Sequence, residues 1–224
     1  MGHYLFHPLV PRKDFPEPHI FFGLDLGRRQ DHAALAILER ASVSTGRRDP
    51  VTFEYVRHLH FVLRHAERLP LGLPYLKVVE RVHDLLHHTT DVLPGNFEVL
   101  PGHPVNPHKT LAVDATGVGA PIVEIFKNSD LRARLMPITI TSGTKSAEDP
   151  FGGYKVPRRD LLTNLRILLE RQLLVIPQTV SHHDELTEEL IHLRDVPTPK
   201  RDDLALALSL AAWTAAKGLN LCHL

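Results

Sequence analysis

The stretch His19-Ile20-Phe21-Phe22-Gly23-Leu24-Asp25-Leu26-Gly27 decides the fold, because a short apolar run that ends in turn residues predicts a buried strand. Residues 31–40 predict a second strand after a polar turn at 28–30, although their alanines also permit a helix. Residues 51–63 alternate apolar and polar side chains and predict a third strand, after turn residues at 42–50. Three consecutive strands indicate an antiparallel meander.

Downstream of the meander, helical and strand patterns alternate. Apolar residues spaced three and four apart predict helices over 73–88, 120–128, 157–171, 181–193 and 202–216. Short apolar runs predict strands over 110–114, 134–141 and 174–177, and glycine- and proline-rich segments predict loops at 93–108 and 142–154. This order is typical of an α/β fold in which a mixed central sheet, an antiparallel meander plus parallel strands, is flanked by helices.

Length and composition favour a single folded domain. The chain has 224 residues, of which 43% are hydrophobic, and this is enough for a sizeable core. Four prolines make residues 1–18 an extended arm, so the domain is predicted to span 19–217, with a C-terminal tail at 218–224. Within the domain, Ser181 is the expected N-cap of its helix, and Trp213 is expected in the core.

The composition argues against several classes of protein. The single cysteine, Cys222, excludes an intrachain disulfide and a thiolate zinc cluster. No apolar run approaches the roughly 18 residues that span a bilayer, so we expect a soluble, intracellular protein with no membrane partner. The histidine pairs at 87–88 and 182–183 point in different directions on a helix, so a structural zinc site is not expected.

The charge balance limits how the chain can bind nucleic acid. Lys plus Arg equals Asp plus Glu at 26 each, so the overall field does not attract a polyanion, and any such contact must come from local clusters. Short basic clusters of this kind are also ordinary solvated surface. The candidates for DNA contact are Arg28, Arg29, Lys155, Arg158, Arg159, Lys200 and Arg201.

Aspartates at the ends of apolar elements are the candidates for chemistry. Asp25 interrupts the first predicted strand, Asp114 ends the strand over 110–114, and Asp202 and Asp203 precede the last helix. A carboxylate in such a setting requires a cation, hydrogen-bond donors or a raised pKa. If the strands of Asp25 and Asp114 are neighbours, the carboxylates meet at one sheet edge and suit one or two Mg²⁺ or Mn²⁺ ions.

Simpler roles exist for the same aspartates. Asp202 or Asp203 could be the N-cap of the last helix, and Asp114, which precedes Ala-Thr-Gly, could be a turn former. Asp31 is a turn or surface residue that could lend a further carboxylate to a metal. Asp25 has no comparable structural role, because a charged side chain within an apolar strand is costly.

Four segments in order resemble a known family. They are Phe22-Gly23-Leu24-Asp25-Leu26-Gly27, Leu111-Ala112-Val113-Asp114-Ala115-Thr116-Gly117-Val118-Gly119, Val156-Pro157-Arg158-Arg159-Asp160-Leu161 and Arg201-Asp202-Asp203-Leu204-Ala205-Leu206-Ala207-Leu208-Ser209-Leu210-Ala211. Together, over about residues 19–217, they resemble the C-terminal nuclease domain of the large terminase subunit of tailed bacteriophages, which has a ribonuclease H-like fold.

The resemblance implies a two-metal endonuclease that uses Mg²⁺ or Mn²⁺ to cut double-stranded DNA during genome packaging. It implies that Asp25, Asp114 and Asp203 are metal ligands with a catalytic role, with Asp202 as a less certain ligand. It also implies that basic residues of the segment Val156–Leu161 and its neighbour Lys155 approach phosphate.

One feature of the family is missing from this sequence. A complete large terminase subunit carries an ATPase with a G-x-x-x-x-G-K-[ST] loop, and this sequence has no such motif. The segment at 102–110 ends in Lys109-Thr110 but lacks the glycine before the lysine. A separate terminase ATPase, a small terminase subunit or a portal protein are therefore the expected protein partners.

Two other functions compete with the nuclease. Asp25-Leu26-Gly27 also resembles the first phosphate loop of actin-like and sugar-kinase ATPases, but the following Arg28-Arg29 is a poor substitute for the small residues that close on phosphate. The second alternative is a catalytically inactive or partner-dependent DNA-binding or assembly module of the same fold.

Overall fold

The computed structural model describes residues 19–27, 31–89, 108–150, 152–193, 201–217 and 219. The predicted arm at 1–18, most of the loop predicted at 93–108 and nearly all of the tail lie outside these residues, as do Arg28, Arg29 and Lys200.

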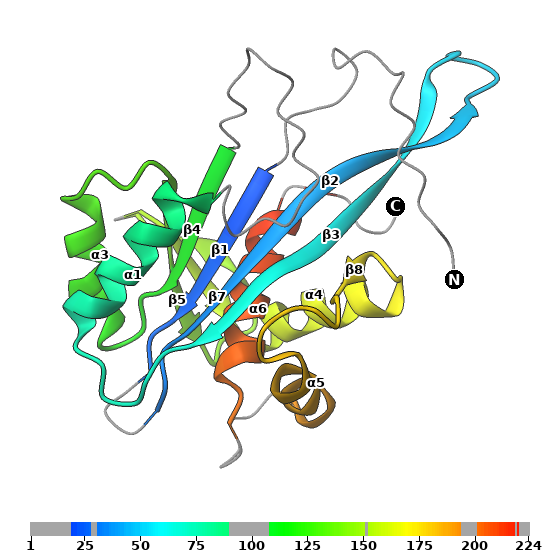
Figure 1. Cartoon of the computed structure of the whole chain (residues 1–224). Helices are drawn as coiled ribbons and strands as arrows, with labels where there is room; N and C mark the ends of the chain where they lie inside the picture. The colour runs from blue at the N-terminus through cyan, green and yellow to red at the C-terminus, as the bar shows by residue number, and fades with distance from the viewer. Residues whose placement is uncertain are drawn as a thin grey trace.

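One eight-stranded mixed sheet forms the centre of the protein (Figure 1), with strands in the order β6-β7-β5-β4-β1-β2-β3-β8. The antiparallel meander consists of β1 (His19–Asp25), β2 (Ala34–Arg48) and β3 (Tyr55–Arg68). The strands that run parallel to β1 are β4 (His108–Asp114), β5 (Arg134–Thr141) and β7 (Tyr154–Pro157). Two-residue strands pair at the edges, β6 (Ala147–Glu148) antiparallel to β7 and β8 (Leu174–Val175) parallel to β3.

Helices cover both faces of the sheet. One face carries α1 (Tyr75–His87) and α3 (Gly119–Lys127), and the other carries α4 (Arg158–Glu170), α5 (His183–His192) and α6 (Asp203–Ala216). The predicted α/β class with a mixed sheet and flanking helices is thus confirmed, and the strand order is consistent with a ribonuclease H-like arrangement. Within the described part of the chain, no helix is long and apolar enough to cross a membrane.

The side chains of β1 alternate between the two faces of the sheet and so contribute to two separate hydrophobic clusters. Ile20, Phe22 and Leu24 pack with α1 and α3, whereas Phe21 packs on the side of α6. Because successive side chains of a strand point to opposite faces, Asp25 also lies on the α6 face. Every residue of α6 except Trp213 is buried, which explains why this helix is apolar nearly all round.

Gly23 allows α6 to lie directly on β1. A Cβ at this position would lie 2.0 Å from the Ala207 carbonyl oxygen and 2.7 Å from the Ala211 backbone nitrogen. At its far end α6 is held by Arg40 of β2, whose Nη1 donates to the Ala215 carbonyl at 2.6 Å. The glycine in the stretch that decides the fold therefore fixes how closely the last helix approaches the first strand.

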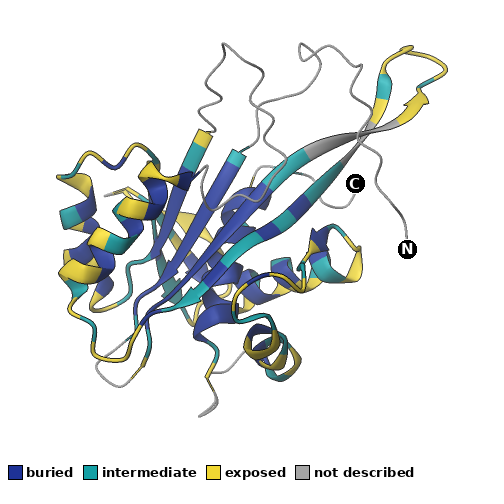
Figure 2. Cartoon of the chain, viewed as in Figure 1, coloured by how far each residue is buried: buried dark blue, intermediate teal, exposed yellow. Residues whose placement is uncertain are grey.

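The β2–β3 hairpin is longer than the sequence predicts. β2 continues through 42–48, where a turn was expected, and the turn instead lies at 49–54, before β3 begins. There the Asp49 carboxylate accepts backbone N–H groups from Val51 and Thr52 at 2.8 and 2.9 Å. The hairpin projects beyond the rest of the sheet and carries an exposed tip (Figure 2), which includes Val51 and Phe53.

Three local predictions are wrong for physical reasons. Residues 142–154 were expected to be loop, but β6 and the start of β7 form there because the edge of β5 offers free backbone partners. His182, in the left-handed region at φ 58°, precedes α5 in place of the expected N-cap Ser181. Trp213 is only partly buried and stands against Tyr154, with ring centroids 5.5 Å apart, rather than in the core.

Gly23→Ala is expected to lower the free energy of unfolding by about 3 kcal/mol or more, because the new methyl group meets backbone atoms that cannot turn aside. Urea unfolding measures the change. The control is Gly143→Ala, where the nearest atom to the new Cβ is the Thr141 hydroxyl at 3.4 Å and the expected change is within about 0.5 kcal/mol. Equal stability of the two variants would contradict the close seating of α6.

Candidate metal centre

β1, β4, β5 and β7 run in the same direction, and their carboxyl ends lie at one end of the sheet. β1 ends at Asp25, β4 at Asp114, β5 at Thr141 and β7 at Pro157. Because neighbouring strands are about 4.8 Å apart, side chains on one face at this edge form a compact row. In α/β sheets, the carboxyl ends of parallel strands are the usual place for a binding site.

Asp25 and Asp114 stand side by side in this row. Leu24 is the register partner of Val113, so the next residue of each strand is one of the two aspartates. Ala112 of β4 packs in the core on the α6 side, and Asp114, two residues later, shares its face. The condition set by the sequence, that the two strands be neighbours, is therefore met.

The turn after Asp114 fixes its carboxylate. Oδ1 of Asp114 accepts the backbone N–H of Thr116 at 2.8 Å, and the Thr116 hydroxyl accepts the N–H of Ile140 at 2.9 Å. A Cβ at Gly119 would lie 1.9 Å from the Asp114 carbonyl oxygen, so the start of α3 also requires a glycine. The turn-forming role expected as an alternative for Asp114 is real, and it coexists with a place at the sheet edge.

The first turn of α6 brings the other two aspartates to the same region. Asp203 is the first residue of α6 and has an exposed fraction of 7%. Asp202 occupies the N-cap position, but its side chain makes no capping hydrogen bond and instead forms an ion pair with Arg158. The alternative in which the Asp202 side chain caps the helix is therefore wrong.

Asp25 is the most unusual group of the cluster. Burial raises the pKa of its carboxyl well above the usual range, and the negative charges of Asp114, Asp203 and Asp202 raise it further, with Arg158 opposing. Its exposed fraction is 9%, and no described residue donates a hydrogen bond to it. A buried carboxyl beside other carboxylates suits a hard divalent cation, because Mg²⁺ and Mn²⁺ prefer oxygen ligands.

Asp203 already has a cation beside it. Arg68, the last residue of β3, donates from Nε to Asp203 Oδ2 at 2.6 Å and from a second nitrogen to Glu189 of α5. Among the described residues, no group of three or more histidine, cysteine, aspartate or glutamate side chains is gathered so that it could hold a metal ion. Asp25 and Asp114 end adjacent strands on the same face of the sheet, whereas Asp203 is paired with Arg68.

The predicted basic residues have different surroundings. Arg158 has a side chain only 12% exposed and is engaged with Asp202, whereas Arg201 is exposed. Lys155 and Arg159 are about half exposed, with Lys155 Nζ 3.2 Å from Asp149 and Arg159 donating to the Thr144 carbonyl at 3.4 Å. Arg28, Arg29 and Lys200 lie outside the described residues.

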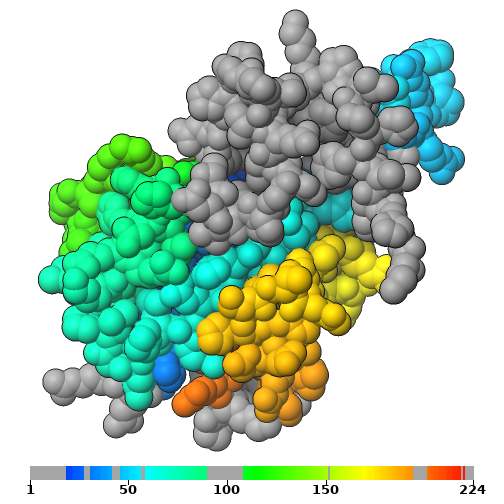
Figure 3. All heavy atoms as spheres, in the orientation of Figure 1, coloured from blue at the N-terminus to red at the C-terminus, as the bar shows by residue number. Residues whose placement is uncertain are grey.

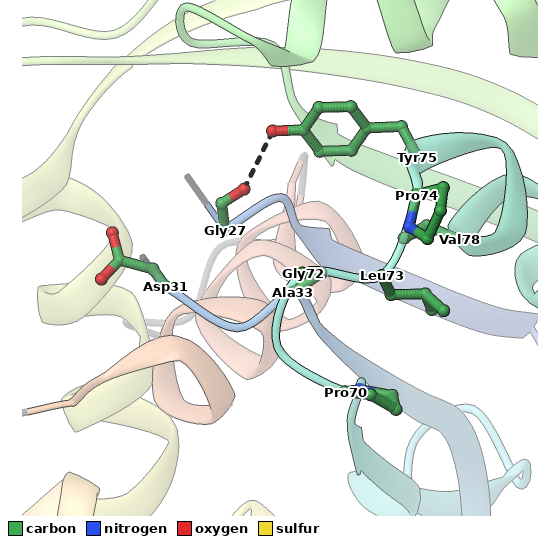
Figure 4. Close-up of a pocket in the computed structure, with 9 residues that line it drawn as sticks. All are labelled: Gly27, Asp31, Ala33, Pro70, Gly72, Leu73, Pro74, Tyr75 and Val78. Atoms are coloured by element: carbon green, nitrogen blue, oxygen red, sulfur yellow. Dashed lines mark hydrogen bonds between the residues drawn. The ribbon is translucent and has the colours of Figure 1, made fainter. Parts of the chain in front are cut away.

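A pocket of about 210 Å³ lies at the same end of the sheet but on the other face (Figure 4). Its walls include Val78 and Leu73 of the α1 side, and the Tyr75 hydroxyl donates to the Gly27 carbonyl at 3.2 Å. Asp31 lies on the opposite side of the pocket from Tyr75 and is exposed. The carboxylates on the α6 face therefore form a separate site, and Asp31 belongs to the pocket.

Sequence reasoning missed Arg68 and Glu189. The third strand was expected to end at residue 63, whereas β3 continues to Arg68. The sequence did contain a signal for Glu189, because this residue lies on the same helical stripe as Leu186 and Leu193. A glutamate on a buried stripe needs a cationic partner, and this could have indicated an arginine or lysine beneath α5.

Compared with protein-family models, the sequence matches none, and a search of curated proteins finds no match.

Asp25→Asn is expected to stabilise the protein in EDTA at pH 8 by roughly 1 kcal/mol or more, because it removes a carboxyl whose charged form is disfavoured by burial and by the neighbouring carboxylates. The folded-state pKa of Asp25 is raised, so its protonation stabilises the fold at low pH and this contribution is lost as pH rises. Urea unfolding at pH 5 and pH 8 should therefore show a gain that grows with pH.

The control for this measurement is Asp130→Asn, whose side chain is 75% exposed and whose effect on stability should be small at both pH values. A folded Asp25→Asn protein that is less stable than wild type at pH 8 in EDTA would contradict the account of this carboxyl.

Proposed function

We propose that the protein is a metal-dependent endonuclease that hydrolyses phosphodiester bonds of double-stranded DNA, in the manner of the terminase nuclease domains that its sequence resembles. The observation that carries the proposal is the pairing of Asp25 and Asp114 at the ends of adjacent parallel strands, with Asp25 buried and given no donor by the described residues. A protein that kept this arrangement for stability alone would gain from replacing Asp25.

Two of the proposed ligands come from strand ends and two from the start of α6. Asp25 and Asp114 would hold Mg²⁺ or Mn²⁺, with Asp203 and Asp202 as further ligands from the start of α6. The chemistry that two such ions supply when bound is activation of a water and stabilisation of the leaving oxygen. The Thr116 N–H holds one oxygen of the Asp114 carboxylate in place at the end of β4.

Exposed basic groups support contact with DNA near the carboxylates. β7 leads into α4 at the edge where β1 and β4 end, so Lys155 and Arg159 lie on either side of that junction. Arg201 is exposed two residues before the start of α6. Contacts of such residues to phosphate would position the duplex without reading its sequence.

The biological setting belongs to the same proposal. A nuclease of this kind in phage DNA packaging would act in the bacterial cytoplasm together with a separate terminase ATPase, a small terminase subunit or a portal protein. The resemblance of the four ordered segments supports these partners.

An inactive DNA-binding or assembly module is the second candidate. It is favoured by the ion pairs of Arg68 with Asp203 and of Arg158 with Asp202, because these give two of the four aspartates a partner without any metal. The two candidates differ in one respect that can be measured, which is the hydrolysis of DNA.

A nicking assay on supercoiled plasmid, with Mg²⁺ and then Mn²⁺, tests the proposal. Wild type should cut in either metal and not in EDTA, and Asp25→Asn and Asp114→Asn should each lower the rate by roughly 100-fold or more. Asp130→Asn, on the surface away from the carboxylates, should cut as wild type does. Full activity of a folded Asp114→Asn protein would overturn the nuclease assignment, and metal-independent binding of DNA without cleavage would favour the inactive module.

A further inference from the structure

We infer that Arg68 is an exchangeable counter-ion of Asp203, which competes with the divalent cation for this carboxylate, and that Glu189 holds Arg68 when Asp203 turns to the cation. The inference rests on the proposed metal site and adds two residues that control how tightly the cation binds. Neither residue is proposed to touch the metal or the DNA.

The three groups form a buried triad where β3, α5 and α6 meet. The exposed fractions of the side chains are 12% for Arg68, 9% for Asp203 and 6% for Glu189. In Figure 3, the atoms of α5 lie directly against those of β3, in agreement with the ion pair between Arg68 and Glu189. Water therefore has little access, and the charges depend on each other for compensation.

The charges of the triad do not balance while Asp203 belongs to it. One guanidinium faces two carboxylates, and burial together with the charge of Asp203 raises the pKa of Glu189 to about 7, against the opposing effect of the Ala205 N–H and Arg68. If Asp203 turned to a cation, Arg68 and Glu189 would remain as a neutral pair. Release of Asp203 would thus not leave a buried charge without a partner, which is the usual cost of breaking such a contact.

Glu189 is also fixed independently of Arg68. Its Oε2 accepts the backbone N–H of Ala205 at 2.8 Å, in the first turn of α6. The glutamate thus anchors Arg68 to the helix that carries Asp203, whereas among the described residues Arg68 is the one hydrogen-bond donor to the Asp203 carboxylate. Of the two carboxylates on Arg68, Asp203 is the one that can exchange.

The row across the sheet brings Arg68 and Asp25 to the face of the sheet that α6 covers. Arg68 pairs in register with Ala34, and Ala34 pairs with Asp25, so all three share the α6 face of the sheet. The side chain between Arg68 and Asp25 in this row is only a methyl group. The charge of Asp203 acts on Asp25 as well as on Arg68, so the same carboxylate serves both sides.

The same strand provides a matched comparison. Arg64 of β3 pairs with the buried Glu39 of β2, again through Nε at 2.6 Å, but with one carboxylate only. Removal of Arg64 therefore breaks a buried ion pair of the same kind without altering the carboxylates of the proposed site.

Direct Mn²⁺ binding to the metal-free protein at pH 8, followed by the electron paramagnetic resonance signal of the free ion, tests the inference. Arg68→Met should bind Mn²⁺ roughly tenfold more tightly, because Asp203 loses its competitor. Glu189→Gln should bind roughly tenfold more weakly, because Arg68 then has Asp203 as its only anionic partner. Arg64→Met should bind within about twofold of wild type.

The opposite directions separate the inference from a merely structural role. If Arg68 and Glu189 only supported the fold, both variants would weaken Mn²⁺ binding or leave it unchanged, and either result would overturn the inference. Should Arg68→Met not fold, Arg68→Lys takes its place, because the single nitrogen of a lysine lacks the rigid fork by which two guanidinium nitrogens reach Asp203 and Glu189, and this variant should also tighten binding.

Asp25→Asn distinguishes this inference from the proposed function. Wild-type binding that is lost in Asp25→Asn but unmoved in the triad variants would overturn the role of Arg68 and leave the metal site standing. Absence of Asp25-dependent Mn²⁺ binding in the wild type would overturn both.

Discussion

The close approach of α6 to β1 at Gly23 is the contact on which the remainder of the structure depends. Because a glycine lets the backbone of the helix lie on the strand, the first turn of α6 reaches the sheet edge where Asp25 and Asp114 end their strands. The helix is tied at its other end by Arg40, which satisfies the Ala215 carbonyl. A side chain at position 23 would push α6 off the strand and carry the acidic start of the helix away from the strand ends.

This approach concentrates negative charge in a region with little water. Two arginines neutralise part of this charge. Arg68 of β3 pairs with Asp203, and Arg158 at the start of α4 pairs with Asp202. Asp25 receives no such partner from the described residues, and the raised pKa of its carboxyl is the electrostatic consequence. Arginines thus neutralise Asp203 and Asp202, whereas the charge of Asp25 has no ion-pair partner among the described residues. Such a site suits a divalent cation that binds reversibly.

The sequence predicts the elements at this edge because their signals are local. The apolar run before Asp25 and the glycine-rich turn after Asp114 each lie within one strand and its turn, and both are found where expected. Arg68 could not be predicted in the same way, since its partners Glu189 and Asp203 are 121 and 135 residues away in the chain. The short strands β6 and β7 were missed for a related reason, because edge pairing and not composition makes them strands.

The central claim is that Asp25 and Asp114 together hold a divalent cation at the sheet edge. Anomalous diffraction at the manganese absorption edge, from crystals soaked in Mn²⁺, tests this most directly. The account predicts a manganese peak in contact with the carboxylates of both aspartates, with Arg68 still on Glu189. A well-ordered map with both carboxylates visible and no manganese between them would contradict it.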